Sequence, residues 1–144
     1  MIMSSTLTEA ERSGLVAAAK QAARRAYCPY SHFRVGAAVL TNRGNIFAGC
    51  NVENASYGLT ICAERNAVFQ AVAASGVESP PELRAVLVYT PTPAPTAPCG
   101  ACRQVINEFG PGCEIVCVCD GLETIHVPLL TLLPLAFGPQ VLNV

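Results

Sequence analysis

The chain has 144 residues, which suits one domain, and with 51% apolar residues it can bury a sizeable core and still leave apolar surface for subunit contacts. Its formal net charge is −1 and it has no long run of lysine or arginine, which excludes stable binding to DNA or RNA by phosphate contacts. No stretch approaches the roughly 20 apolar residues of a membrane helix and the N-terminus does not resemble a signal peptide, so we expect a soluble, cytoplasmic protein.

Helical and strand patterns alternate along the chain. Thr8 and Glu11 fit a capping box, Gly44 sits in a turn that suits positive φ, and Gly76 is a plausible helix stop. Four prolines stiffen the loop at 91–98, to which the pattern assigns no function. In chain order we predict a helix at 8–25, an aromatic-rich loop at 27–33, strands at 35–40 and 46–52, a helix at 62–76, a strand at 84–89, a helix at 100–109, strands at 114–119 and 124–127, and a short apolar helix at 129–135.

This order predicts an α/β fold for a single domain spanning 1–144. We expect three α/β/α layers, with one mixed five-stranded sheet between helices. A strand-helix-strand unit normally joins parallel strands by a right-handed crossover, so each crossover helix starts at the carboxyl edge of the sheet. Cys62 and the pair Cys99 and Cys102 should therefore meet at helix N-termini on one edge, where sites of open α/β sheets lie.

Eight cysteines in a chain without a signal peptide indicate reduced thiols, some of them metal ligands. The motifs are Cys62-Ala63-Glu64-Arg65 and Pro98-Cys99-Gly100-Ala101-Cys102-Arg103. Three thiolates fit a catalytic zinc site, which keeps one position open for water. A carboxylate two residues beyond a ligand could act there as acid and base without binding the metal.

Three thiolates on a divalent ion carry a net charge of −1, which should weaken the metal as a Lewis acid. The helix N-termini, Arg65 and Arg103 could offset this charge by donating hydrogen bonds to sulfur. The structural alternative is a closed zinc knuckle, in which another thiol, His32 or His126 supplies the fourth ligand.

These motifs and several others resemble the small, homotetrameric cytidine deaminases over nearly the whole chain. The matching pieces are Tyr27-Cys28-Pro29-Tyr30-Ser31-His32-Phe33, Val35-Gly36-Ala37-Ala38, Gly49-Cys50-Asn51-Val52-Glu53-Asn54-Ala55, Cys62-Ala63-Glu64-Arg65, Pro98-Cys99-Gly100-Ala101-Cys102-Arg103-Gln104 and Phe137-Gly138-Pro139. The resemblance implies zinc-dependent hydrolysis of cytidine and deoxycytidine to uridine and deoxyuridine, with release of ammonia, in pyrimidine salvage. The zinc signature with its non-ligating glutamate is itself a general feature of zinc deaminases.

The resemblance also implies roles for individual residues. Cys62, Cys99 and Cys102 would bind zinc, and Glu64 would be the proton shuttle. Asn51 and Glu53 would bind the ribose 3′-hydroxyl, and Phe33 and Ala63 would lie near the base. Phe137 would reach a neighbouring subunit's pocket and Tyr57 would sit at a subunit boundary, so that sites are shared in a homotetramer. On sequence alone, a polar turn explains Asn51 and Glu53 and core packing explains Phe33 and Phe137.

The expected substrate is a free nucleoside, because a carboxylate at Glu53 can accept a hydrogen bond from a sugar hydroxyl but repels phosphate. The chain departs from the family pattern at Ala97, where serine is usual, and at Leu130 and Thr131, where more polar residues are usual. Three alternatives stay open: a deaminase of a modified nucleoside such as blasticidin S, a polynucleotide-editing deaminase, and a non-enzymatic zinc-stabilised protein.

Overall fold

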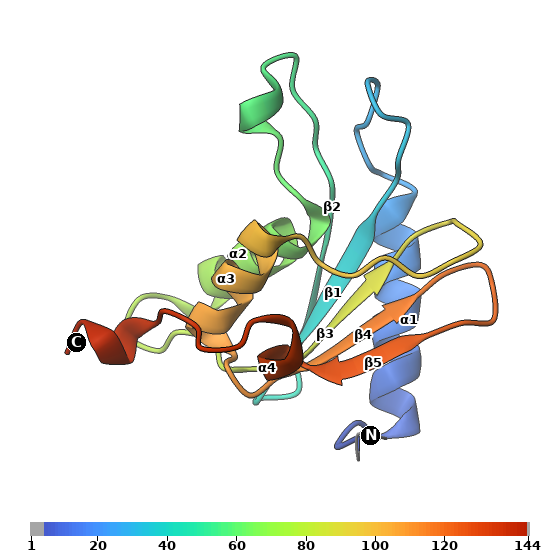
Figure 1. Cartoon of the computed structure of the whole chain (residues 1–144). Coiled ribbons are helices and arrows are strands. Elements are labelled where there is room, and N and C mark those ends of the chain that lie inside the picture. The colour runs from blue at the N-terminus through green and yellow to red at the C-terminus, as the bar shows by residue number, and fades with distance from the viewer. Residues whose placement is uncertain (1–4, 144) are drawn as a thin grey trace.

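The computed structural model describes residues 5–143, and its centre is a five-stranded sheet with helices on both faces (Figure 1). The strands are β1 (Gly36–Thr41), β2 (Ile46–Cys50), β3 (Leu83–Tyr89), β4 (Glu114–Val118) and β5 (Ile125–Pro128). The α-helices are α1 (Glu9–Ala23), α2 (Ala63–Ser75), α3 (Gly100–Phe109) and α4 (Leu129–Leu132), and short 3-10 turns occupy Tyr57–Leu59 and Pro139–Val141.

The strand order is β2-β1-β3-β4-β5, and the sheet is mixed. β1 pairs antiparallel with both β2 and β3, β3 pairs parallel with β4, and β4 pairs antiparallel with β5. β2 and β3 therefore run in the same direction, and so do β3 and β4. Each of α2 and α3 consequently starts at the carboxyl end of the strand before it, which confirms the expected α/β fold and places both helix N-termini at one edge.

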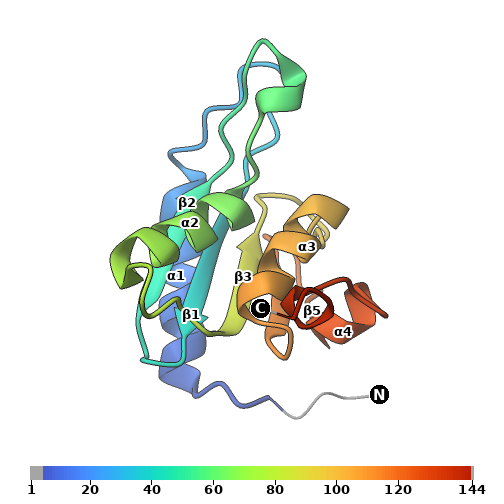
Figure 2. The same ribbon diagram turned by 90° about the vertical axis from the view of Figure 1, so that its left-hand side faces the viewer.

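The sheet has a core on each face because side chains alternate along its strands. Ala38 and Leu40 of β1 join the cluster that contains Leu15 and Ala19 of α1. Their neighbours on β1 face the opposite way and pack with α2, α3 and the neighbouring strands. Figures 1 and 2 show the same arrangement, with α1 behind the sheet and α2 and α3 together on the other side.

The predicted capping box is present at the start of α1. The Glu11 backbone N–H donates to Thr8 Oγ1 over 3.1 Å, and the Thr8 N–H donates to Glu11 Oε2 over 2.9 Å. The helix ends at Ala23 rather than Arg25, and the Arg34 guanidinium donates to the carbonyl oxygens of Arg24 and Ala26 beyond it.

Other predicted boundaries differ by a few residues. β2 ends at Cys50, and Val52 forms only isolated bridges to Tyr27 and Ile61, because the chain leaves the sheet there. α4 stops at Leu132 rather than 135. Within residues 5–143, no helix combines the length and the apolar character needed to cross a membrane.

Candidate active site

Three cysteine sulfurs converge at the edge where α2 and α3 begin. Cys62 is the N-cap of α2, Cys99 is the N-cap of α3, and Cys102 lies in the first turn of α3. Their Sγ atoms all lie within 4.8 Å of one another, and those of Cys62 and Cys99 are 3.9 Å apart. Sulfurs on a tetrahedral zinc, with bonds of about 2.3 Å, stand about 3.8 Å apart, so the three thiols fit this ion.

The cluster contains three protein ligands within the described part of the chain. Among residues 5–143, these three cysteines are the whole of the ligand group, with no histidine or carboxylate in it. His126 lies on β5 with its Nε2 2.7 Å from Glu114 Oε2, and His32 lies outside the cluster in a loop. The described residues thus give no fourth protein ligand for the closed zinc knuckle, the structural alternative that the sequence left open.

Arg65 lies beside the sulfur cluster and donates a hydrogen bond to one of its sulfurs. Its Nη2 donates to Cys62 Sγ over 3.3 Å. A hydrogen bond from the Cys102 thiol and then the Arg65 guanidinium lower the pKa of Cys62 to about 5. The same hydrogen bond to Cys62, together with burial, raises the pKa of Cys102. The Arg65 Nε atom is buried and has no hydrogen-bond partner among the residues that the structure describes.

Glu64 places a carboxyl group beside the sulfurs without joining them. It follows Cys62 at the start of α2 by two residues, and only 4% of its surface is exposed. Burial, and then the negative charge of Cys62, raise the pKa of this carboxyl to about 7. A protonatable group in a water-poor setting is suited to acid and base chemistry.

Arg103, the second arginine expected near the sulfurs, donates hydrogen bonds to backbone carbonyls. Its Nε donates to the Pro98 carbonyl over 2.7 Å, and its Nη1 donates to the Leu132 carbonyl over 3.0 Å. Both bonds go to backbone oxygens rather than to a thiolate, because the guanidinium points along the loop before Cys99 and toward α4. The expected role of Arg103 at a thiolate stays a prediction.

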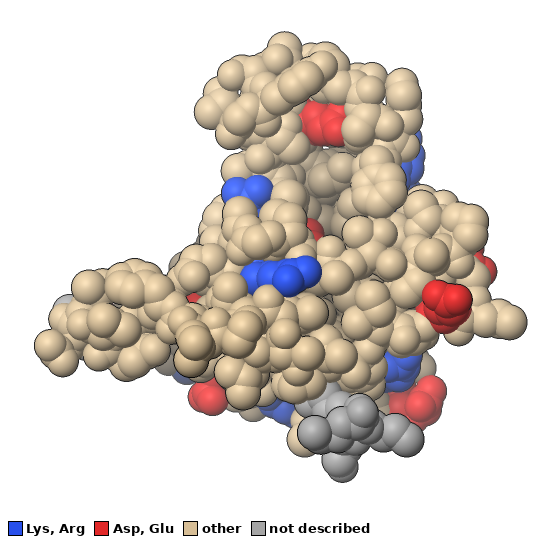
Figure 3. Space-filling model, in the orientation of Figure 1, with Lys and Arg blue, Asp and Glu red and all other residues tan. Residues whose placement is uncertain are grey.

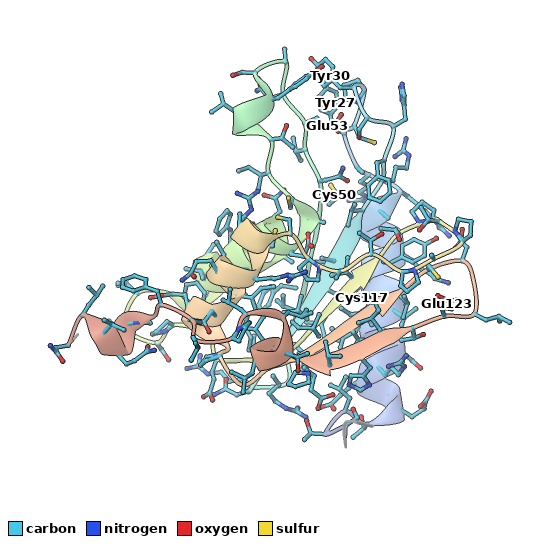
Figure 4. The ribbon with its side chains drawn as sticks, viewed as in Figure 1. Tyr27, Tyr30, Cys50, Glu53, Cys117 and Glu123 are labelled. Atoms are coloured by element: carbon cyan, nitrogen blue, oxygen red, sulfur yellow. The ribbon has the colours of Figure 1, made fainter. Side chains whose placement is uncertain are left out.

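Two loops project beyond the sheet edge above the sulfur cluster. Tyr30 and Glu53 lie on these loops, above Cys50 at the end of β2 (Figure 4). Glu53 Oε1 accepts hydrogen bonds from the backbone N–H groups of Tyr30 and Ser31 over 2.9 and 3.1 Å, and its Oε2 accepts one from the Ser31 hydroxyl. The hydroxyl bond is the main cause of a lowered pKa for Glu53. The carboxylate thus holds the two loops together in this structure.

Asn51 is also engaged with the backbone. Its Nδ2 donates to the Phe33 carbonyl over 2.8 Å, and its Oδ1 accepts from the Val35 N–H over 2.9 Å. The residue is 8% exposed. One N–H and one oxygen lone pair of the amide remain free of these two bonds.

The other expected substrate contacts are spread over the loops, α2 and the tail. Phe33, Tyr57 and Phe137 are 41%, 73% and 57% exposed, whereas Ala63 is fully buried. Tyr57 stacks obliquely on Tyr30, with 5.6 Å between the ring centroids. Figure 3 shows a hollow between the projecting loops and the body, on a face with few charged groups.

The sequence did not single out the residues that hold the tail. Gln104 Nε2 and Asn107 Nδ2 both donate to the Phe137 carbonyl, over 2.9 and 3.2 Å. Both lie on α3, and their spacing of three residues places them on one helix face. That spacing is the only sequence signal for this contact, and it does not reveal the partner.

Comparison with known proteins gives a consistent result. The family model described as the cytidine and deoxycytidylate deaminase zinc-binding region matches residues 9–119. A cytidine deaminase of Sporosarcina psychrophila is 53% identical over 95 residues, which are 66% of this chain and 67% of that protein. A cytidine deaminase of Halalkalibacterium halodurans is 48% identical over 101 residues, which are 70% of this chain and 74% of that protein.

Solved structures show the same likeness. The crystal structure of cytidine deaminase from Burkholderia pseudomallei superposes with a TM-score of 0.80 at 48% identity, covering 91% of this chain and all of that one. The crystal structure of cytidine deaminase from Mycobacterium tuberculosis gives a TM-score of 0.72 at 39% identity, covering 88% of this chain and 97% of that one.

Proposed function

Because the chain belongs to the cytidine and deoxycytidylate deaminase family, we propose that it hydrolyses cytidine and deoxycytidine to uridine and deoxyuridine with release of ammonia. It is a zinc-dependent hydrolase that acts on cytidine, as the family match and the relatives of high identity indicate. Deoxycytidine as a second substrate, and pyrimidine salvage as the physiological purpose, are our extension of that activity. One observation carries the proposal: three sulfurs at two helix N-termini with a buried carboxyl group beside them.

Cys62, Cys99 and Cys102 are the residues that would hold zinc. The bound metal supplies Lewis acidity, which brings the pKa of a water molecule close to neutrality. Arg65 offsets the negative charge of the thiolates through its bond to Cys62. The N-termini of α2 and α3 add positive partial charge at the same place.

Glu64 is the proposed proton carrier. It takes up a proton from water and delivers one to N3 of cytosine, while the water oxygen forms a bond to C4. Glu64 then carries the proton of the new C4 hydroxyl to the exocyclic nitrogen, the C4=O bond forms as the bond between C4 and that nitrogen breaks, and ammonia leaves. Water and cytidine are consumed and uridine and ammonia are formed, so the atoms balance. Burial of Glu64 keeps bulk water from competing for these protons.

The proposed sugar site lies on the projecting loops that carry Tyr30 and Glu53 (Figure 4). We propose that Glu53 and Asn51 bind the ribose through the hydrogen-bonding capacity left over from their contacts with the 30–35 backbone. Phe33 and Ala63 would lie near the base. A carboxylate beside the sugar disfavours a 5′-phosphate and a polynucleotide, which points to a free nucleoside.

We propose a homotetramer with shared sites. Large apolar side chains stay exposed on the projecting loop and the tail, namely Tyr57 (73%), Leu59 (65%), Phe137 (57%) and Leu142 (59%). Such surface in a single subunit favours burial against other copies. Phe137 would complete a neighbour's pocket, and Tyr57 would lie at the same boundary. Sedimentation equilibrium of the full chain tests this assembly, and a monomer with full activity would contradict it.

One domain over residues 1–144 and a cytoplasmic location belong to the same proposal. A single sheet built from strands between residues 36 and 128 supports the single domain. Expression of the full chain with a fluorescent label, followed by microscopy and fractionation, tests the location.

The direct test is ammonia release from purified protein. We expect cytidine and deoxycytidine to yield ammonia, a zinc chelator to abolish the release, and added zinc to restore it. Blasticidin S assayed beside them separates a modified-nucleoside deaminase from a cytidine deaminase. Ammonia release from cytidine that survives complete removal of zinc would contradict the proposed mechanism.

A further inference from the structure

The proline-rich loop at 91–98 leads directly from β3 to the expected zinc ligand Cys99. It runs beside the turn between β4 and β5, on which Glu123 lies (Figures 1 and 4). The Asp120 N–H donates to the Thr92 carbonyl over 3.0 Å, and Cys119 Sγ donates to the Pro93 carbonyl over 3.5 Å. The first half of the loop is therefore bonded to this turn.

Gly121 allows the turn and the loop to approach so closely. A Cβ atom at this position would lie 2.0 Å from the Pro93 carbonyl oxygen and 3.1 Å from its carbonyl carbon. Both are backbone atoms, so they cannot rotate away as a flexible side chain would. Gly121 does not have positive φ, unlike Gly44 and Gly76. Close contact with Pro93, rather than backbone conformation, accounts for the glycine.

The turn is anchored to the core, so it is not free to yield to such a clash. The Tyr89 hydroxyl donates to Asp120 Oδ1 over 2.7 Å. Tyr89 is only 9% exposed, and Lys20 Nζ lies 5.4 Å from the centroid of its ring. Because Tyr89 holds the turn at Asp120, a displacement between turn and loop should fall mainly on the loop.

The other end of the loop is fixed next to the metal site. Arg103 Nε donates to the Pro98 carbonyl over 2.7 Å, and Cys99 is the next residue. Pro93, Pro95 and Pro98 each hold φ near −65°, which leaves this part of the loop fewer degrees of freedom to absorb a shift. A displacement at Pro93 is consequently transmitted toward Cys99.

We propose that Gly121, with the anchored turn at 119–123, is a positioning residue for Cys99, acting through the proline-rich loop. The function of the loop is then to fix the position of the Cys99 thiol in the sulfur cluster. This inference rests on the proposed zinc ligands. It concerns only where the chain holds Cys99.

The test compares Gly121→Ala with Gly112→Ala in the full chain. Zinc affinity is measured by competition with a chromophoric chelator, and ligand geometry by the visible spectrum of the cobalt(II)-loaded protein. For Gly121→Ala we expect the zinc Kd to rise about 10-fold or more, in the range known for residues that orient metal ligands, with shifted cobalt bands. Gly112 has open space around it, so its variant should match the wild type in both measurements.

A second variant covers the case in which Gly121→Ala fails to fold. Tyr89→Phe keeps the ring but removes the hydroxyl that anchors the turn, and we expect a smaller change in the same direction. If the folded variants show wild-type zinc affinity and cobalt spectra, the positioning role is wrong. A wild-type protein without cobalt–thiolate charge-transfer bands would instead contradict the zinc ligand set itself, so the two failures are distinguishable.

Discussion

Asn51 and Glu53 combine two roles: each bonds to the backbone of a neighbouring loop, and each is proposed to bind the sugar. The sequence suggested either a polar turn or a sugar site, and in the structure both side chains bind backbone groups of the 30–35 segment. A residue that orders a loop before substrate arrives reduces the entropy lost on binding. We infer that these contacts shape the sugar site as well as lining it.

Asn51→Ala tests this structural task. The change removes two buried hydrogen bonds and leaves the Val35 N–H and the Phe33 carbonyl without these partners, so the free energy of unfolding should fall by about 1–3 kcal/mol. Urea denaturation measures it, with the exposed Asn45→Ala as the matched control. An unchanged stability with a raised KM for cytidine would show that Asn51 serves the ligand alone.

Glu64→Gln tests the proposed role of Glu64 as the proton carrier. Glutamine keeps the size of the side chain but cannot transfer a proton, so kcat should fall by about 10²–10⁴-fold. Zinc content should remain at one per chain, because Glu64 is not among the three sulfur ligands. Steady-state kinetics and elemental analysis are the measurements.

The control for Glu64 is Glu78→Gln, which changes an exposed carboxylate away from the sulfur cluster. It should leave kcat and zinc content unchanged. If Glu64→Gln kept more than about a tenth of the wild-type kcat, another group would have to move the proton.

At the scale of elements, the site depends on how closely α2 approaches the sheet. A Cβ atom at Gly49 of β2 would lie 2.5 Å from the Ala67 nitrogen and 2.8 Å from the Ala63 carbonyl oxygen, both in α2. The helix backbone therefore rests almost directly on the strand. Since Cys62 and Glu64 lie at the start of this helix, its position sets theirs.

Gly49→Ala should push α2 away from β2. We expect a loss of about 1–3 kcal/mol in the free energy of unfolding, the usual result of overpacking, together with weaker zinc binding. Thermal and urea denaturation measure the first effect and chelator competition the second. Gly112→Ala, with open space around the glycine, should change neither. A Gly49→Ala protein as stable as the wild type would mean that α2 can shift without cost.

The sequence was sufficient to predict the order of the helices and strands, and to predict that Cys62 lies close to Cys99 and Cys102. Helical and strand periodicities and the crossover rule determine those features locally or topologically. The sequence did not predict the hydrogen bonds of Arg103 to the Pro98 and Leu132 carbonyls, or those of Glu53 with Ser31. These are hydrogen bonds between irregular segments, whose partners no periodic pattern reveals.

At the scale of the whole molecule, the N-terminal segment is tied to the far strands of the sheet. Glu114, at the start of β4 and 2% exposed, accepts hydrogen bonds from Ser5 Oγ over 2.8 Å and from Thr6 N and Oγ1 over 2.6 and 2.7 Å. His126 Nε2 lies 2.7 Å from its Oε2. This carboxylate therefore joins segments that lie more than 100 residues apart in the sequence.

Acid should weaken this tie. Burial acts to raise the pKa of Glu114, but the bonds from Thr6, His126 and Ser5 outweigh it and lower the pKa to about 2, from an ordinary value of 4.5. The positive charge of Arg84 and the buried Cys113 thiol are its other titratable neighbours. A carboxylate with a lowered pKa stabilises the folded state fully above pH 4.5, and this contribution disappears as the pH falls toward 2.

Glu114→Gln measures that contribution. At pH 7 the variant should be less stable than the wild type by on the order of 2 kcal/mol, because bonds to an ionised carboxylate are stronger than those to an amide. The difference in the free energy of unfolding should hold down to about pH 5 and then shrink between pH 4.5 and 2, as protonation makes the wild-type side chain neutral too. Urea denaturation at pH 7, 5 and 3 follows it, with the exposed Glu123→Gln as the control. A difference that stays constant or grows at pH 3 would show that the Glu114 charge does not hold the N-terminal segment to the sheet.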